Sequence, residues 1–232
     1  MPPHKLTRES VVSAAVDLAD REGIAALTMR SLARHVGVEA MSLYHHLPNK
    51  EALLDAMVDR VYAAIELPAP DGDWHAGLRN RSESVRAVLL QHPWALPLME
   101  SRHAPGPANL AYHEATIACL RAAGFGPAQV AHAYAVIDAF VYGFVLQETT
   151  LPFDSGEEAA AMVTDGPFSE FLARYPNMMW FTTNVVLAPG YSFGREFAPG
   201  LELVLDGIAA RLGDGIPETT PAPQTGAATT DT

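Results

Sequence analysis

Apolar residues near the N-terminus recur at the spacing of an amphipathic helix. The residues of one apolar face follow the i, i+3, i+4, i+7 spacing and are Val12, Ala15, Val16 and Ala19. Thr7 precedes this segment as a good N-cap residue, and Gly23 follows it. The pattern predicts a helix over residues 8–21.

The same signals recur over the next 20 residues. Thr28 is placed to cap a short helix over residues 29–35, which ends at Gly37. A third short helix is predicted over residues 39–46, because Pro48 cannot continue it. The spacing predicts a compact unit of short helices.

A longer helix follows, capped by Asn49. Its apolar stripe consists of Leu54, Val58, Val61 and Ile65. Residues 66–73 then combine Pro, Gly and Asp, which is typical of a break between domains. We therefore predict an N-terminal domain over residues 1–65 and a second domain over residues 66–212.

The second domain is also helical by pattern. Helices are predicted over 74–91, 94–102, 107–123, 127–149 and 195–212, with a further helical piece near 167–174. Residues 151–165 are expected to form a loop with a short helix at best, and 178–188 fit a helix or a strand. Residues 213–232 are rich in Thr, Pro, Gly and Ala, which predicts a disordered tail. The fold class is all-α.

Charge is unevenly distributed along the chain. The net charge is −12, but residues 1–65 hold seven Lys and Arg against eight Asp and Glu, and four of the nine His. A DNA-binding protein needs a basic face and not a basic chain. Only the N-terminal domain can supply such a face.

Cysteine content and apolar run length point to a cytoplasmic protein. Cys119 is the single cysteine, so no disulfide forms within the chain, and its predicted role is a small buried residue on a helix. No signal peptide and no uninterrupted apolar run of membrane-spanning length are found. We expect no membrane partner, no cofactor and no metal.

Residues 28–47 have the pattern of a helix-turn-helix. The positions that pack inward together are Leu32, Ala33, Val36, Val38, Leu43 and Leu47. In this geometry the second helix enters the major groove of DNA. The predicted DNA-contacting residues are Thr28, Arg30, Ala40, Met41, Ser42, Tyr44, His45, His46 and Lys50. Arg30 suits a bidentate guanine contact, and Lys50 suits a phosphate.

Residues 8–65 resemble the DNA-binding domain of the TetR family of regulators. The resemblance is carried by Leu27-Thr28-Met29-Arg30, Leu32-Ala33, Val36-Gly37-Val38, Leu43-Tyr44-His45-His46-Leu47 and Asn49-Lys50-Glu51-Ala52-Leu53-Leu54. It implies a homodimer on a palindromic operator of double-stranded DNA, usually a repressor, which a small-molecule effector releases. His45, Ala40 and Met41 depart from the family pattern, so the base sequence bound should differ. Ile65-Glu66-Leu67 offers no histidine for a tetracycline–magnesium effector.

Candidate effector and dimer contacts lie in the second domain. Trp94, Met99, His113 and Phe144 are candidates for a pocket lined by apolar and aromatic residues. A stripe of small residues with four-residue spacing consists of Ala131, Ala135, Ala139 and Gly143. With Leu201, Leu205, Ile208 and Leu212 of the last helix, it predicts a four-helix dimer interface. Packing within one chain is the alternative for these residues.

Two other functions remain open at this point. The helical domain of a DNA-binding regulator can serve dimerisation alone, without an effector. Gly190-Tyr191-Ser192-Phe193-Gly194 also matches the G-x-S-x-G motif of serine hydrolases. That motif requires strands around it and a histidine after the serine, whereas the last histidine here is His132.

His45 and His46 are adjacent and point apart on a helix, which argues against a metal site.

Overall fold

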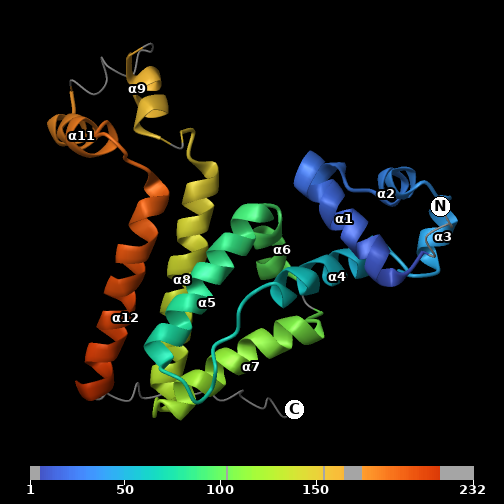
Figure 1. The fold of residues 1–232 in the computed structure, drawn as a ribbon, viewed down its shortest axis with the longest axis horizontal. Coiled ribbons are helices and arrows are strands. Elements are labelled where there is room, and N and C mark those ends of the chain that lie inside the picture. Colours follow the sequence, from blue (N-terminus) through green and yellow to red (C-terminus); the bar gives the residue numbers. More distant parts are fainter. Residues whose placement is uncertain (1–5, 103, 154, 165–173, 215–232) are drawn as a thin grey trace, which may run out of the picture.

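The computed structural model describes residues 6–102, 104–153, 155–164 and 174–214. Every regular element within these residues is a helix (Figure 1). The elements are α1 (Arg8–Glu22), η1 (Ile24–Ala26), α2 (Met29–Val36), α3 (Ala40–Tyr44), α4 (Lys50–Ala63), α5 (Trp74–Gln91), α6 (Ala95–Ser101), α7 (Pro107–Ala122), α8 (Pro127–Thr150), α9 (Gly156–Thr164), α11 (Pro176–Phe181), η2 (Thr182–Val186), η3 (Phe193–Glu196) and α12 (Phe197–Asp214).

The predicted caps fix the starts of the N-terminal helices. The Thr7 hydroxyl accepts a hydrogen bond from the backbone N–H of Ser10 over 3.1 Å at the start of α1. Asn49 accepts one from the backbone N–H of Ala52 over 2.8 Å at the start of α4. Each bond satisfies an N–H group that the helix itself leaves unpaired. The local sequence signals therefore placed these helices correctly.

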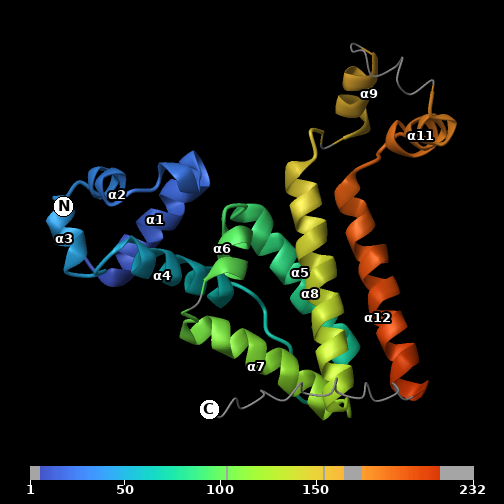
Figure 2. The same ribbon diagram turned by 180° about the vertical axis from the view of Figure 1, so that it is seen from behind.

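Three long helices form the framework of the C-terminal part. Helices α5, α8 and α12 run side by side in both views, and α12 contacts both α8 and α5 (Figures 1 and 2). Helix α7 contacts α4, α5 and α8, so it joins this framework to the N-terminal helices. Buried Cys119 lies on α7, as predicted. The α4–α7 contact packs the N-terminal helices against the larger C-terminal part.

The structure decides several of the segment predictions made from the sequence. Residues 178–188 are largely helical, because α11 continues into the π-helical turn η2. Helix α12 begins at Phe197, and Pro199 falls within its first turn, where proline is tolerated. The predicted helical piece at 167–174 lies outside the described residues except for residue 174. The tail predicted at 213–232 also lies outside them except for residues 213–214, which are not a tail but the last residues of α12. The break predicted at 66–73 falls between α4 and α5.

The apolar stripe of α12 packs inside its own chain. Leu201 and Leu205 are 0% exposed, so the prediction that they form an intersubunit surface is wrong. Their spacing was interpreted correctly as an apolar face, but α5 and α8 already cover it. Ile208 is half-buried, and the side chain of Leu212 lies outside the described residues. The outward side of α12 instead carries Leu203, which is 77% exposed.

Helix α8 is unusually apolar for a helix with an open face. It is long and apolar enough to cross a membrane by length and composition, and only 28% of its most apolar 18-residue window is buried. Its inner face packs on the core through Ala133, Ile137 and Val141. Much of the apolar surface of α8 is therefore not covered by the residues that the structure describes.

Candidate DNA-binding site and effector cavity

The turn between α2 and α3 depends on a single glycine. Gly37 adopts the left-handed conformation at φ 78° and ψ 33°, which side chains other than glycine rarely adopt. Its N–H donates to Arg34 O over 3.3 Å, and the N–H of Val38 donates to Ala33 O over 3.0 Å. This is the Schellman arrangement, which satisfies the last carbonyls of α2 and redirects the chain into α3.

The predicted inward positions hold α2 and α3 together. Leu32, Leu43 and Leu47 are fully buried, and Val36 and Val38 are partly buried against the same core. Fixing these side chains fixes which residues of α3 face outward. Met41 on the short α3 is 70% exposed, so its side chain is accessible to a partner.

The predicted DNA contacts all reach the surface. The exposed members are Thr28, Arg30, Met41, Tyr44, His45 and Lys50, and the half-buried members are Ala40, Ser42 and His46. Thr28 forms a capping box with Ser31, whose backbone N–H donates to the Thr28 hydroxyl over 3.0 Å. Its hydroxyl also donates to Ser31 Oγ over 3.0 Å, so it is already occupied within the helix.

Helix α4 is fastened to the larger domain by its acidic side chains. Arg102, at the end of α6, donates from Nε to Asp55 Oδ1 over 2.6 Å and from Nη1 to Glu51 Oε2 over 2.7 Å. Asp59, one turn further along, accepts from the backbone N–H groups of Ala108 and Asn109 over 2.9 and 3.0 Å. A carboxylate at the N-terminus of α7 is favoured by the unpaired N–H groups and the helix dipole.

A second connection joins α1 to the same domain. Asp20 accepts a hydrogen bond from the indole Nε1 of Trp94 over 2.6 Å, and its carboxylate lies 2.8 Å from His92 Nδ1. Trp94 was predicted as an effector contact, but its polar atom is directed to α1. The structure therefore places Trp94 between the two halves of the chain.

A cavity of about 520 Å³ lies against the C-terminal end of α4. Its lining comes from α4, α6, α7, α8 and the α6–α7 connection, and consists of Tyr62, Met99, Glu100, Arg102, Pro105, Asn109, His113, Tyr134, Ala135, Asp138, Ala139 and Tyr142. Two predicted effector contacts, Met99 and His113, are brought together here. Phe144 is elsewhere, in an aromatic cluster where its ring stacks on Phe193 at 4.5 Å between centroids.

A buried polar network supports one wall of this cavity. Arg81 on α5 is 1% exposed and donates from Nη2 to Asp138 Oδ1 over 2.7 Å and to the Tyr112 hydroxyl. Its guanidinium also lies over the Tyr112 ring, 4.4 Å from the centroid. Because a buried guanidinium requires a counter-charge, Asp138 is held in place as the partner of Arg81.

Burial sets the protonation of the groups around the cavity. Burial and the negative charges of Glu100 and Asp138 raise the pKa of Tyr62 to about 12. Burial, followed by the charge on Asp138, also raises the pKa of Tyr134. Burial lowers the pKa of His113, which is hydrogen-bonded to the Tyr134 hydroxyl. At neutral pH the cavity therefore presents neutral tyrosines and a neutral imidazole beside carboxylates.

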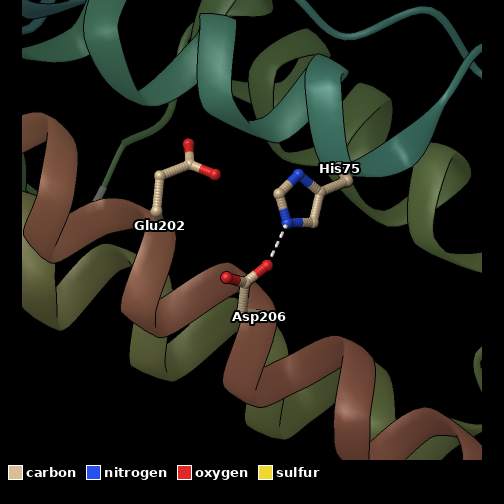
Figure 3. Close-up of side chains that lie close together, drawn as sticks. All are labelled: His75, Glu202 and Asp206. Atoms are coloured by element: carbon tan, nitrogen blue, oxygen red, sulfur yellow. Dashed lines mark hydrogen bonds and ion pairs between the residues drawn. The ribbon is translucent and has the colours of Figure 1, made fainter.

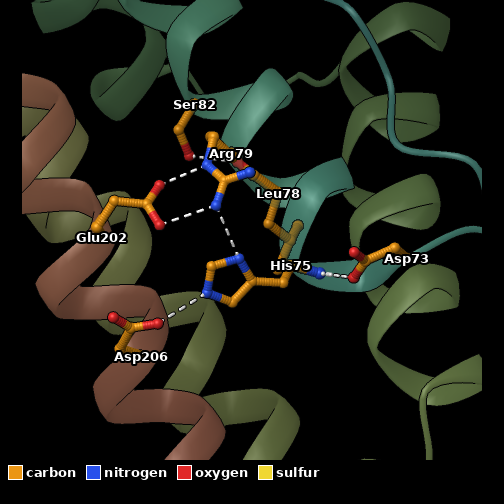
Figure 4. Close-up of polar contacts among 7 residues, drawn as sticks. All are labelled: Asp73, His75, Leu78, Arg79, Ser82, Glu202 and Asp206. Carbon is orange, nitrogen blue, oxygen red and sulfur yellow. Dashed lines mark hydrogen bonds and ion pairs between the residues drawn. The ribbon is translucent and has the colours of Figure 1, made fainter.

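His75, Glu202 and Asp206 form the one group within the described residues that has the composition of a cation site (Figure 3). Their ligand atoms all lie within 4.8 Å of one another. Arg79 Nη2 donates to Glu202 Oε2 over 2.8 Å and lies 3.1 Å from His75 Nδ1 (Figure 4). The Arg79 guanidinium thus supplies the positive charge, and the cluster holds α5 against α12.

The G-x-S-x-G segment has a structural explanation. Gly190 adopts a positive φ of 78°, which forms the turn before η3. Gly194 packs against the ion pair of Arg86 and Glu148, where a Cβ atom would clash with both side chains. Ser192 is extended and precedes a short 3₁₀ helix, with no strand leading into it. Backbone conformation therefore explains Gly190 and packing explains Gly194, without a nucleophile elbow.

Comparison with protein families identifies the chain. Residues 11–57 match the model described as "Bacterial regulatory proteins, tetR family", and residues 67–212 match "Tetracyclin repressor-like, C-terminal domain". The chain belongs to the TetR family. TetR-family proteins are DNA-binding transcriptional regulators and not enzymes, so the serine-hydrolase hypothesis is wrong.

Individual relatives support this membership over most of the chain. An HTH-type transcriptional regulator of Saccharopolyspora erythraea is 36% identical over 213 residues, covering 90% of this chain and 86% of the relative. The HTH-type transcriptional repressor DrrR1 of Streptomyces coeruleorubidus is 33% identical, covering 93% of this chain and 83% of the relative.

Solved structures match this TetR-family regulator in fold. Apo ActR from Streptomyces coelicolor superposes with a TM-score of 0.72 at 27% identity, covering 92% of this chain and 99% of ActR. ActR in complex with actinorhodin superposes with a TM-score of 0.68 at 26% identity, covering 90% of this chain and 99% of ActR.

Sequence analysis missed the residues that join the two halves. Neither Arg102 nor the acidic residues of α4 were singled out, although Glu51, Asp55 and Asp59 recur at the four-residue spacing of one helical face. Tyr62 and Asp138 were also missed. That acidic stripe was the available signal that α4 has a polar partner along its length.

Proposed function

We propose that this TetR-family regulator is a homodimeric repressor that leaves a palindromic operator when a small apolar or aromatic molecule binds its helical domain. The observation that carries the proposal is that α4 belongs to both sites. Lys50 begins α4 next to the helix-turn-helix, and Tyr62 near its end lines the cavity. We also keep the division at residues 66–73 and a cytoplasmic location as parts of the proposal.

The DNA-binding part of the proposal uses the exposed side chains of α2 and α3. Arg30 is exposed and its guanidinium suits a guanine edge, and Met41 and Ala40 suit a thymine methyl group. Ser42, Tyr44, His45, His46 and Lys50 supply donors for phosphates. Because the Thr28 hydroxyl is occupied by its capping box, Thr28 is proposed to act mainly by presenting the N-terminus of α2.

A second copy of the chain is the proposed partner of α8 and α12. Leu203 and Val136 are 77% and 49% exposed, and they line one open groove of about 510 Å³ between these helices. Ala131, Ala135 and Ala139 are exposed along α8, and Gly143 is half-buried. Helices α8 and α12 of one copy and the same two helices of the other copy would form a four-helix interface. The small residues of α8 allow these helices to approach closely.

Release of DNA is proposed to pass through α4. A molecule that fills the cavity contacts Tyr62 and the end of α6, where Arg102 holds Asp55. A shift of α6 then moves α4, and with it the two recognition helices of the dimer. An effector changes the equilibrium only as far as it binds the DNA-free arrangement more tightly.

The experiment is an electrophoretic mobility shift with the DNA upstream of the protein's own gene, at two salt concentrations. A specific complex weakens with salt but resists non-specific competitor DNA. The proposal is contradicted if non-specific competitor DNA abolishes the retardation. It is also contradicted if the protein retards no DNA even at low salt. The alternative, a regulator without an effector, is tested by thermal shift against a panel of aromatic compounds, since a ligand raises the melting temperature.

A further inference from the structure

We infer that the effector of this protein is a flat aromatic cation, and that Glu100 binds its positive charge. The inference rests on the proposed function, because it assigns a ligand chemistry to the same cavity. It follows from the charges that face the cavity and from the partner that each charge already has.

The positive charges at the cavity are all occupied. Arg102 is bound to Asp55 and Glu51 of α4, and Arg81 behind the wall is bound to Asp138. His113 is neutral at neutral pH because burial lowers its pKa. An anionic effector would therefore have to break an existing ion pair before it found a partner.

One negative charge at the cavity is not occupied. Across the part of the chain that the structure describes, Glu100 has no ion pair, although it lines the cavity beside Met99. The Asp138 carboxylate on α8 also lines the cavity and is shared with Arg81. A ligand cation beside Glu100, which is an exposed residue, gains attraction from it without displacing any protein group.

The remaining wall suits a flat aromatic cation. The rings of Tyr62, Tyr134 and Tyr142 line the cavity, and the faces of such rings attract cations. Burial keeps these phenols protonated, as the raised pKa values of Tyr62 and Tyr134 indicate. The wall therefore combines stacking surface, hydroxyl donors and one free carboxylate.

Three acridines that share one tricyclic ring and differ in charge test the inference. They are 9-aminoacridine, which is a cation at neutral pH, acridine, which is neutral, and acridine-9-carboxylate, which is an anion. Their dissociation constants are measured with the full-length protein, without DNA, by ligand fluorescence and by thermal shift. We expect 9-aminoacridine to bind most tightly and acridine-9-carboxylate most weakly.

Substitution of Glu100 shows whether this carboxylate is the cause. Glu100→Gln should weaken the binding of 9-aminoacridine about two- to fivefold, as expected for an ion pair to an exposed carboxylate, and leave the binding of acridine unchanged. Glu100→Lys should reverse the preference toward acridine-9-carboxylate. Glu114→Gln removes an exposed carboxylate of α7 outside the cavity, so it measures attraction due only to the net charge of −12.

Equal affinities for the three acridines, a preference for the anion, or an equal loss in Glu100→Gln and Glu114→Gln would each overturn the inference. Failure of 9-aminoacridine to bind a folded protein would also overturn it. Each of these results leaves operator binding in the mobility-shift experiment intact, so failure of the inference is distinguishable from failure of the proposed function.

Discussion

Arg102 and Asp55 join the two halves of the molecule through an ion pair of 2.6 Å between Nε and Oδ1. Their side chains are 17% and 26% exposed, whereas Glu51, the other acidic partner of Arg102, is 68% exposed. The same guanidinium lines the cavity, so it touches both the proposed effector site and the helix that leads to DNA.

The difference in exposure predicts different costs for the two acidic partners. Asp55→Asn leaves the Arg102 charge with a weaker partner in a half-buried site and should lower the free energy of unfolding by about 1–3 kcal/mol. Glu51→Gln should cost about 0–1 kcal/mol, because an exposed pair contributes little. Its backbone carbonyl also keeps a 3.1 Å bond from Arg102. Urea unfolding of both variants checks this, and equal losses would contradict it.

Gly106 should not tolerate a side chain. A Cβ atom there would meet the carboxylate of Asp59, which cannot move without breaking its bonds to the N-terminus of α7. Gly106→Ala should therefore lower the free energy of unfolding by about 1–3 kcal/mol. Gly72→Ala is the matched control, since the nearest atom to its added Cβ is 3.6 Å away, which is an ordinary contact. It should raise the free energy of unfolding by about 0.4–1 kcal/mol, and a gain in both variants would refute the packing argument.

The proposed dimer interface predicts different effects for substitutions of two exposed leucines. Leu203→Glu should weaken the dimer at least about 100-fold, because a two-fold interface buries this side chain twice at about 1.5–3 kcal/mol each. Leu110→Glu on α7, also an exposed leucine at 56%, should leave the dimer intact. Sedimentation velocity distinguishes the species, and a dimeric Leu203→Glu protein would rule out this face.

The lowered pKa of His113 predicts that the folded protein becomes less stable in mild acid. Burial lowers its pKa below the usual 6.5, so the unfolded chain takes up this proton more readily than the folded one. The contribution of His113 is fully present above pH 6.5 and is lost as pH falls through the folded pKa. His113→Gln should therefore flatten the melting temperature between pH 7 and pH 5 relative to the wild type. A His113→Gln protein whose melting temperature has the same pH dependence as that of the wild type would contradict the assignment.

Local features of this chain were predictable from sequence, and pairings between distant segments were not. Thr7 and Asn49 act within four residues of themselves, so composition alone identified the helix starts. The stripe of Leu201 and Leu205 was equally visible, but spacing does not tell whether a face meets its own chain or another. Arg102 and Asp55 lie 47 residues apart, and only the folded chain brings them together.

One measurement tests directly whether the effector cavity and the DNA-binding site are coupled. A compound that raises the melting temperature of the protein is titrated into the complex with its operator, and the bound fraction is followed by fluorescence anisotropy of the DNA. The account predicts that the operator is released as the cavity fills, and that Arg30→Ala weakens operator binding by about 1–3 kcal/mol while Arg121→Ala on α7 does not. An operator complex that is unchanged by a saturating amount of the bound compound would contradict the account.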